Sequence, residues 1–194
     1  MKKIEIKEFG GPEVLKIKNV DIGKPGQNEV LVKNLSIGIN YIDTYHRSGL
    51  YPIPLPSGIG LEACSIIEEV GSEVKLFKVG DRVTRASMPI GTYSEKQIIP
   101  EDKLVKVPDN ISDEVASCIT LKGITAEYLL HRTYQVKKGD KILYHAAAGA
   151  LGQIFCPWAN ALGAEIIGTV GSDEKIEIAK KNGCHHVINY NEKN

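Results

Sequence analysis

One short glycine-rich segment has residue types and a spacing that could bind a phosphate group. Ala146, Gly149 and Gly152 occupy every third position, between an apolar run and an amphipathic run. In this context glycine lets the backbone approach a pyrophosphate, and the amino end of the following helix supplies N–H groups and a positive dipole. Alanine at the first position makes the signal weaker than three glycines, and a turn that binds nothing is the alternative. We expect a dinucleotide-binding loop.

The residues after the second strand of this region indicate which dinucleotide would bind. An NAD site usually has an acid near the end of that strand, but the strand here ends Thr169-Val-Gly-Ser172. Asp173 is expected to begin a helix, where an acid is favourable in any case. Lys175 in the first helical turn opposes the helix dipole, so it would gain from a 2′-phosphate, with Ser172 and Tyr190 adding hydrogen bonds. NADPH is therefore the expected cofactor, and a solvated surface lysine is the alternative.

Neither the cysteines nor the histidines have the spacing of a metal site or of a disulfide framework. No CxxC motif occurs, so buried thiols in a reducing compartment are expected. The histidines are interpreted as surface or structural residues, and no Ser/His/Asp or Cys/His arrangement indicates covalent catalysis. The cysteines are Cys64, Cys118, Cys156 and Cys184, and the histidines are His46, His131, His145, His185 and His186.

The elements that must position these residues change in type along the chain. Before residue 109 the pattern is of short strands separated by turns with glycine and proline, which favours a barrel-like all-β unit. The predicted strands are Ile4–Lys7, Val14–Val20, Glu29–Gly38, Ser65–Val70, Asp81–Thr84, Tyr93–Ile99 and Leu104–Val107. Helical periodicity follows over Val115–Ile119 and Thr125–Tyr134, with Ser112 as a helix N-cap.

From residue 139 strands and helices alternate in a βαβαβ order, which is typical of half a parallel nucleotide-binding sheet. The predicted elements are strands Lys141–His145, Glu165–Val170 and His186–Tyr190 and helices Gly149–Leu162 and Asp173–Asn182. Gly163 and Gly183 are expected to end the helices. Pro157 interrupts the first helix, where a proline costs about 3 kcal/mol and normally causes a kink. The overall prediction is an α/β fold.

Length and composition limit the classes of function. The chain has 194 residues, with 42% hydrophobic residues and 24 basic residues against 24 acidic ones. This length fits one domain plus part of another. The zero net charge argues against a nucleic-acid partner or an anionic membrane surface. No apolar run reaches the length of a signal peptide or a membrane span, so a cytoplasmic location is expected.

Several longer segments form a pattern that is specific in combination, although each is weak alone. They are Gly10–Leu15, Gly38–Tyr45, Arg47–Pro52, Pro56–Glu62, Val79–Val83, Leu121–Thr125, Ala146–Gly152 and Gly168–Gly171. Together they resemble the zinc-independent quinone oxidoreductases of the zeta-crystallin type, in the medium-chain dehydrogenase/reductase superfamily, over nearly the whole chain. The resemblance implies a GroES-like β-barrel catalytic domain at residues 1–122 and a partial NADP-binding Rossmann domain at residues 123–194.

The resemblance also implies an NADPH site. Lys175 and Tyr190 match the positions that hold the adenosine 2′-phosphate in this family, in agreement with the helix-dipole argument. The expected cofactor-binding residues are Tyr41, Ile42, Asp43, Thr44, Tyr45, Tyr128, Gly149, Ala150, Leu151, Gly152, Gly171, Ser172, Asp173, Glu174, Lys175 and Tyr190.

The expected catalytic residues follow from a comparison with the alcohol dehydrogenases, which bind zinc through a Cys, the His of Gly-His-Glu and a later Cys. Here Asn40 and Gly60–Glu62 stand at the first two positions, and Cys118 alone cannot build a zinc site. Without a Lewis acid a quinone remains a suitable acceptor, because the charge that hydride transfer places on it spreads to its carbonyl oxygens. Asn40, Tyr45 and Tyr51 could donate hydrogen bonds to that charge. Alternatively, the tyrosines pack in the core or against the cofactor.

The expected activity is therefore NADPH-dependent reduction of a quinone by direct hydride transfer. One alternative is an alkenal or enone double-bond reductase on the same scaffold. Another is a non-catalytic truncated fragment, because the later strands of this family, which complete the nucleotide pocket, the substrate wall and the dimer interface, are absent. RNA binding is a weaker alternative that the zero net charge disfavours. A homodimer is expected of a full-length relative.

Overall fold

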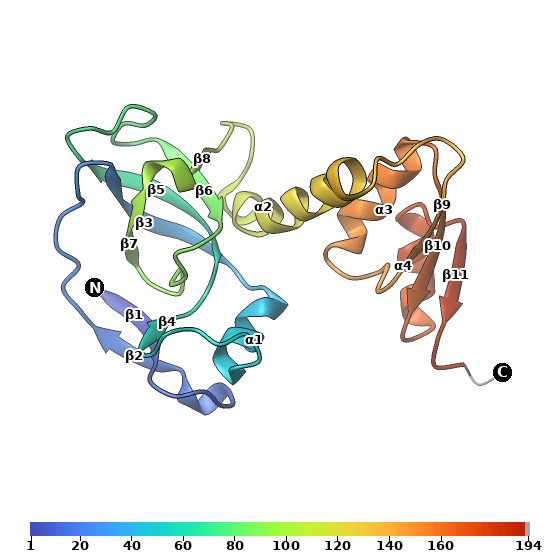
Figure 1. Ribbon diagram of the computed structural model, residues 1–194, viewed down its shortest axis with the longest axis horizontal. Coiled ribbons are helices and arrows are strands. Elements are labelled where there is room, and N and C mark those ends of the chain that lie inside the picture. Colours follow the sequence, from blue (N-terminus) through green and yellow to red (C-terminus); the bar gives the residue numbers. More distant parts are fainter. Residues whose placement is uncertain (193–194) are drawn as a thin grey trace. The chain divides into compact units, whose positions relative to one another are not determined.

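The computed structural model describes residues 1–192, which divide into two compact units. The first unit is Met1–Leu121, and the second begins at Lys122 (Figure 1). The boundary expected from the sequence resemblance lies after residue 122. Strands dominate the first unit, whereas strands and helices alternate in the second. The predicted α/β class is therefore confirmed.

The first unit is built on an antiparallel five-stranded sheet of order β7-β3-β5-β6-β8. Its strands are β3 (Glu29–Gly38), β5 (Glu62–Val70), β6 (Arg82–Ala86), β7 (Lys96–Pro100) and β8 (Val105–Lys106). A smaller sheet of order β2-β1-β4 contains β1 (Lys2–Ile6), β2 (Lys16–Asn19) and β4 (Ser57–Gly58). Alternate residues of β3, Val30 and Val32, are fully buried and pack with Ile67 and Val83 in one core cluster. Leu31, which lies between Val30 and Val32, is buried as well, so the apolar start of β3 is covered on both faces.

One helix of the first unit, α1 (Tyr41–Ser48), contradicts the prediction of only strands and turns in this region. Its end signals are nonetheless local. Asn40 precedes it with an extended backbone, Asp43 lies in its first turn, and Gly49 ends it with φ at 81°. The helix has eight residues, too few for an apolar period to reveal it.

A single long helix, α2 (Asp113–Tyr128), begins in the first unit and ends in the second. The apolar periodicity predicts two shorter helical runs in its place, Val115–Ile119 and Thr125–Tyr134. The helix continues through Gly123, where an added Cβ would meet no atom within 4 Å. It leads directly into a π-helical turn, η3 (Leu129–Thr133). Two short 3-10 helices, η1 (Pro12–Val14) and η2 (Glu101–Lys103), complete the helices of the first unit.

The second unit has the predicted βαβαβ order and a parallel sheet of order β11-β10-β9. The elements are β9 (Lys141–Tyr144), α3 (Gly152–Ala161), β10 (Glu165–Val170), α4 (Glu174–Lys181) and β11 (His186–Asn189). Phe155 of α3 and Ile166 of β10 belong to its core, and Tyr144 stacks on Phe155 with ring centroids 4.3 Å apart. Gly163 and Gly183 follow the two helices with φ at 87° and 89°, as predicted.

Pro157 lies inside α3, which runs on to Ala161. The proline ring cannot donate to the carbonyl of Gln153, four residues earlier. Both residues are exposed, so water can hydrogen-bond to that carbonyl. The proline is therefore on the solvent side of the helix, while the neighbouring Phe155 and Cys156 are buried.

Candidate functional site

The glycine-rich loop joins the carboxyl end of β9 to the start of α3. Ala146 has a left-handed backbone with φ at 55°, and it is the only residue other than glycine with a positive φ within residues 1–192. The Gly149 amide donates to the Ala146 carbonyl at 2.8 Å, and the Ala147 amide donates to the Thr169 carbonyl at 3.0 Å. A Cβ at Gly152 would lie 2.4 Å from the Ala147 carbonyl oxygen, so no side chain fits there. The loop thus presents bare backbone at the amino end of a helix, as phosphate binding requires.

The carboxyl end of β10 brings together the residues expected to hold a 2′-phosphate. A Cβ at Gly171 would lie 2.5 Å from the Tyr190 hydroxyl oxygen, so this hydroxyl lies directly over the glycine. Lys175 is exposed in the first turn of α4 and forms no ion pair with any residue in the described part of the chain. Asp173 accepts a hydrogen bond from Asn189 Nδ2 at 2.7 Å. This bond gives the acid a structural role.

Three tyrosines form an edge-to-face cluster in the first unit. The ring centroids of Tyr41 and Tyr45 lie 5.2 Å apart, as do those of Tyr45 and Tyr51, with interplanar angles of 83° and 62°. Tyr41 is 76% exposed and Tyr51 is 51% exposed, which excludes core packing for both. Tyr45 is half-buried between them. The cluster offers aromatic surface and hydroxyl groups to a planar molecule.

Asn40 is nearly buried, and its side chain is held by a buried carboxylate. Asn40 Nδ2 donates to Glu62 Oε2 at 2.9 Å. Glu62 is fully buried, and its Oε1 accepts a hydrogen bond from the Leu121 amide of α2 at 2.7 Å. One side chain of β5 thus links the residue before α1 to the middle of α2. This role cannot be read from the sequence, in which Glu62 stands out only as part of an altered zinc motif.

Asp43, expected to contact the cofactor, is also buried. Its Oδ2 accepts hydrogen bonds from the backbone amide of Asn40 and from the Tyr93 hydroxyl, both at 2.9 Å. Burial raises the pKa of Asp43, outweighing these two bonds, which act to lower it. Because the carboxyl group is engaged inside the unit, Asp43 could meet a cofactor only through its backbone.

Tyr128, the last residue of α2, lines a cavity of its own unit. It is 42% exposed and lines an open cavity of about 650 Å³ in the second unit. The lining residues are Gly123, Ile124, Glu127, Tyr128, Arg132 and Trp158. None of the loop residues lines this cavity, and a contact of Tyr128 with the cofactor stays a prediction.

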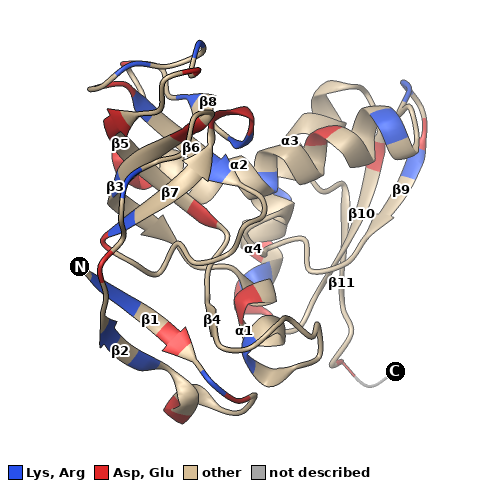
Figure 2. Ribbon diagram, turned by 60° about the vertical axis from the view of Figure 1, so that its left-hand side comes forward, with Lys and Arg blue, Asp and Glu red and all other residues tan. Residues whose placement is uncertain are grey.

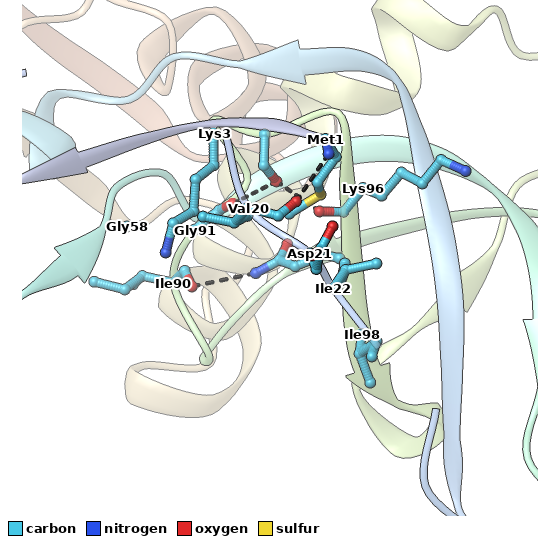
Figure 3. Close-up of a pocket in the computed structure, with 12 residues that line it drawn as sticks. Met1, Lys3, Val20, Asp21, Ile22, Gly58, Ile90, Gly91, Lys96 and Ile98 are labelled. Carbon is cyan, nitrogen blue, oxygen red and sulfur yellow. Dashed lines mark hydrogen bonds between the residues drawn. The ribbon is translucent and has the colours of Figure 1, made fainter. Parts of the chain in front are cut away.

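Another cavity of the first unit, of about 420 Å³, is lined by none of the predicted site residues (Figure 3). Lys3 of β1 and Lys96 of β7 line it. Their ammonium groups are paired with Glu5 at 2.9 Å and with Glu68 at 2.6 Å. Both lysines are thus already ion-paired, and this cavity is not our candidate site.

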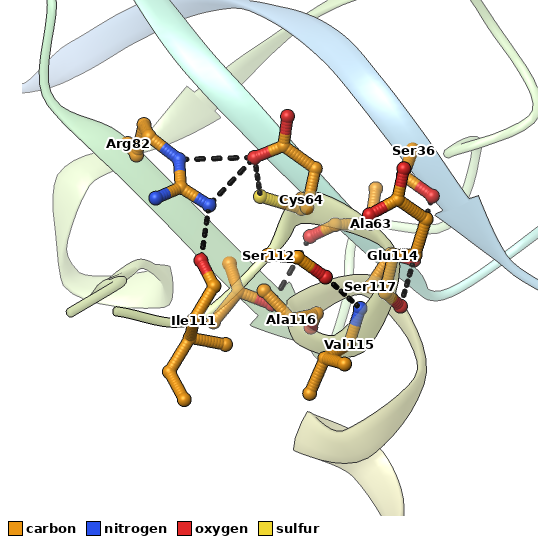
Figure 4. A network of polar contacts seen from close by, with 12 residues as sticks. Ser36, Ala63, Cys64, Arg82, Ile111, Ser112, Glu114, Val115, Ala116 and Ser117 are labelled. Atoms are coloured by element: carbon orange, nitrogen blue, oxygen red, sulfur yellow. Dashed lines mark hydrogen bonds and ion pairs between the residues drawn. The ribbon is translucent and has the colours of Figure 1, made fainter. Parts of the chain in front are cut away.

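A polar network fixes the start of α2 to the five-stranded sheet (Figure 4). Arg82 donates to Asp113 Oδ1 through Nε at 2.9 Å and through a terminal nitrogen at 2.6 Å, and also to the Ile111 carbonyl. The Cys64 thiol lies 3.5 Å from the same carboxylate oxygen. Burial, together with Asp113, raises the pKa of Cys64 to about 11. A thiol with so high a pKa is a poor nucleophile, so we assign this network a structural role.

The described part of the chain contains no group of three or more histidine, cysteine, aspartate or glutamate side chains that could hold a metal ion. Cys118, the residue near the third zinc position, is exposed.

No helix within residues 1–192 is long and apolar enough to cross a membrane. Figure 2 shows acidic and basic residues interspersed along the chain.

Two family models match the chain. The alcohol dehydrogenase GroES-like domain matches residues 26–109, and the zinc-binding dehydrogenase domain matches residues 150–194. These matches confirm the predicted GroES-like domain and the start of a Rossmann-like nucleotide-binding domain.

Individual relatives match nearly the whole chain. A quinone oxidoreductase of Pseudomonas aeruginosa is 50% identical over 194 residues, which are all of this chain and 60% of that protein. A 2-haloacrylate reductase of a Burkholderia species is 48% identical over 95% of this chain and 57% of its own. The crystal structure of the Escherichia coli quinone oxidoreductase complexed with NADPH matches with a TM-score of 0.96 and 50% identity, over 100% of this chain and 60% of that one. The chain thus spans about three fifths of the length of these relatives.

Proposed function

Because the chain belongs to the quinone oxidoreductase family of the medium-chain dehydrogenase/reductase superfamily, we propose that it binds NADPH and reduces a quinone by direct hydride transfer without zinc. One observation carries the proposal. The exposed side chain of Lys175 and the hydroxyl of Tyr190 both lie at the carboxyl end of β10, where an adenosine 2′-phosphate is bound in such sheets. The NADPH complex of the Escherichia coli relative supports it.

The cofactor-binding residues would act as follows. When bound, NADPH supplies the hydride. Lys175 neutralises the 2′-phosphate and Tyr190 donates to it, while Gly149 and Gly152 let the backbone amides approach the pyrophosphate. Gly152 has no room for a Cβ, so the loop keeps a bare backbone there. This is the feature of the structure that fits a bound pyrophosphate best.

The acceptor would lie against the tyrosine cluster. A quinone that gains a hydride carries negative charge on its carbonyl oxygens, and a proton from solvent then completes the hydroquinone. The hydroxyls of Tyr45 and Tyr51 would donate to that charge. Asn40 would orient the acceptor, since Glu62 holds its amide in one position.

A second candidate function is reduction of a conjugated carbon–carbon double bond. It is favoured by the 48% identity to a protein named 2-haloacrylate reductase. Steady-state rates with a benzoquinone, an enone and a 2-haloacrylate, each with NADPH, separate the two functions. A kcat/KM for the enone or the haloacrylate far above that for any quinone would overturn our first choice.

Cofactor binding is tested by titrating the purified chain with NADPH and with NADH, following nicotinamide fluorescence. We expect a preference for NADPH that Lys175→Ala removes, because the lost charge-assisted contact corresponds to a change of about tenfold or more. Lys181→Ala is the matched control, since it removes an exposed lysine from the last turn of the same helix. Absence of NADPH binding, or equal effects of the two substitutions, would refute the proposal.

We assign the protein to the cytoplasm. All four cysteines are free, including the buried Cys156 and Cys184. Free thiols persist in compartments that keep them reduced. Fractionation of cells that express the protein at its native level tests this assignment.

A further inference from the structure

One histidine at the edge of the nucleotide-binding sheet has no role in the function proposed above. His145 directly follows β9 and precedes the glycine loop, at the carboxyl end of the first parallel strand. Its side chain is exposed and belongs to no core cluster. Dinucleotides bind at the carboxyl ends of the strands of a parallel sheet. An exposed histidine here is therefore well placed to contact one.

The imidazole of His145 is held in a defined orientation by the next strand. His145 Nδ1 lies 3.1 Å from Thr169 Oγ1. Tyr144 is paired with Gly168 in the register of β9 and β10, so His145 and Thr169 are the next pair along the strands, with side chains on one face. Thr169 is 6% exposed, and its carbonyl also accepts from the Ala147 amide at 3.0 Å. One threonine therefore fixes both the histidine ring and the first turn of the loop.

This anchoring leaves the other ring nitrogen directed away from Thr169. In the described part of the chain no hydrogen bond is formed by His145 Nε2. If Thr169 donates its hydroxyl proton to Nδ1, the neutral ring carries its own proton on Nε2 and can donate it to a ligand.

We infer that His145 is a further cofactor-binding residue, whose Nε2 donates a hydrogen bond to the pyrophosphate of the dinucleotide, and that Thr169 is its positioning residue. The inference rests on the proposed function. The pyrophosphate is favoured over the 2′-phosphate because His145 lies next to the glycine loop after β9, whereas Lys175 and Tyr190 lie beyond β10 and β11. The two ends of the cofactor would thus be held by separate groups of residues.

Two ligands and two sets of variants test the inference. Adenosine 2′-monophosphate carries the 2′-phosphate but no pyrophosphate, and NADPH carries both. We expect His145→Ala to weaken NADPH binding about tenfold, as loss of a hydrogen bond to a charged group does, and to change the affinity for adenosine 2′-monophosphate by less than about twofold. His145→Asn, which can keep the contact to Thr169 but has no distal nitrogen, should behave like His145→Ala.

The positioning role has its own pair of variants. Thr169→Val has nearly the same shape without the hydroxyl, and it should weaken NADPH binding several-fold with no effect on adenosine 2′-monophosphate. Thr169→Ser keeps the hydroxyl and should bind both ligands as the unchanged chain does. A thermal melt of each variant confirms that it is folded.

The outcomes separate the inference from the function on which it rests. Lys175→Ala should weaken binding of both ligands, whereas the His145 variants should affect NADPH alone. If Lys175→Ala has this effect and His145→Ala has none, the inference is wrong and the proposed function stands. If His145→Ala weakens both ligands equally, or the unchanged chain binds adenosine 2′-monophosphate but not NADPH, the pyrophosphate contact is excluded. If the unchanged chain binds neither ligand, both proposals fail.

Discussion

The fully buried Glu62 carboxylate accepts a hydrogen bond from the side-chain amide of Asn40 at 2.9 Å. Its second oxygen accepts from the Leu121 amide in the middle of α2 at 2.7 Å. The sequence resemblance predicts that both residues fall within motifs that bind zinc in the alcohol dehydrogenases, and here they are hydrogen-bonded to each other. The pair therefore supports the first unit and fixes the orientation of a candidate catalytic amide.

A direct test of this pair is the exchange of donor and acceptor. Glu62→Gln must direct its amide nitrogen at either the Asn40 or the Leu121 donor, which should lower the free energy of unfolding by about 1–3 kcal/mol. Asn40→Asp alone places two carboxylates together and should also destabilise the chain. In the double variant the introduced amide can donate to the introduced carboxylate and still accept from Leu121, so part of the loss should be recovered. Denaturant unfolding of the three variants measures this coupling, and additive losses would contradict it.

The role of Glu62 shows why part of the site could not be predicted from the sequence. Two of its partners, Asn40 and Leu121, are 22 and 59 positions away along the chain, and only the folded unit brings them together. The βαβαβ order of the second unit was predictable, because apolar periodicity and the terminal glycines Gly163 and Gly183 are local signals. Helix α1 was missed although Asn40 and Gly49 mark its ends, because its few residues show no period.

The buried Asp43 predicts a pH dependence of stability. Burial raises its pKa in the folded chain above its ordinary value, so the folded state holds this proton more tightly than the unfolded state. The free energy of unfolding should then fall as the pH rises from about 4, the ordinary pKa of an aspartate, through the raised value, and level off above it. Asp43→Asn removes this titration, so its stability relative to the unchanged chain should improve with pH over that range. The control is Asp21→Asn at an exposed position, and a difference that does not vary with pH would refute the prediction.

The left-handed backbone of Ala146 leads us to expect that replacing this residue by glycine stabilises the chain. The φ of 55° at Ala146 is a left-handed conformation, which costs a residue with a Cβ about 1–2 kcal/mol. Ala146→Gly removes this cost but adds freedom to the unfolded chain, so the net gain should be about 0.5–1 kcal/mol. Ala161→Gly, at the exposed last residue of α3, should instead lose up to about 1 kcal/mol. Chemical denaturation of both variants checks these opposite signs, and a loss in both would mean that Ala146 is not strained.

At Gly152, in the same loop, we expect a substitution to destabilise the chain. An added Cβ would lie 2.4 Å from the Ala147 carbonyl oxygen, so Gly152→Ala must displace the loop backbone and should cost about 1–3 kcal/mol. The displaced amides should also weaken NADPH binding. Gly123→Ala in α2 is the matched control, since its Cβ meets no atom within 4 Å and should stabilise the helix by up to about 1 kcal/mol. Unfolding curves and NADPH titrations of the two variants are the measurements, and unchanged binding in Gly152→Ala would argue against a phosphate at this loop.

The tyrosine cluster predicts which step of the proposed reaction depends on hydroxyl groups. Tyr45→Phe and Tyr51→Phe keep the edge-to-face contacts of the rings, whose centroids lie 5.2 Å apart, and remove only the donors. If these hydroxyls stabilise charge on the acceptor as the hydride arrives, each substitution should lower kcat by about tenfold or more with little change in NADPH affinity. Tyr134→Phe, at an exposed position outside the candidate site, should have no effect. Rates with a benzoquinone, together with NADPH titrations, check the prediction. A rise in KM with an unchanged kcat would instead mean that the cluster only binds the acceptor.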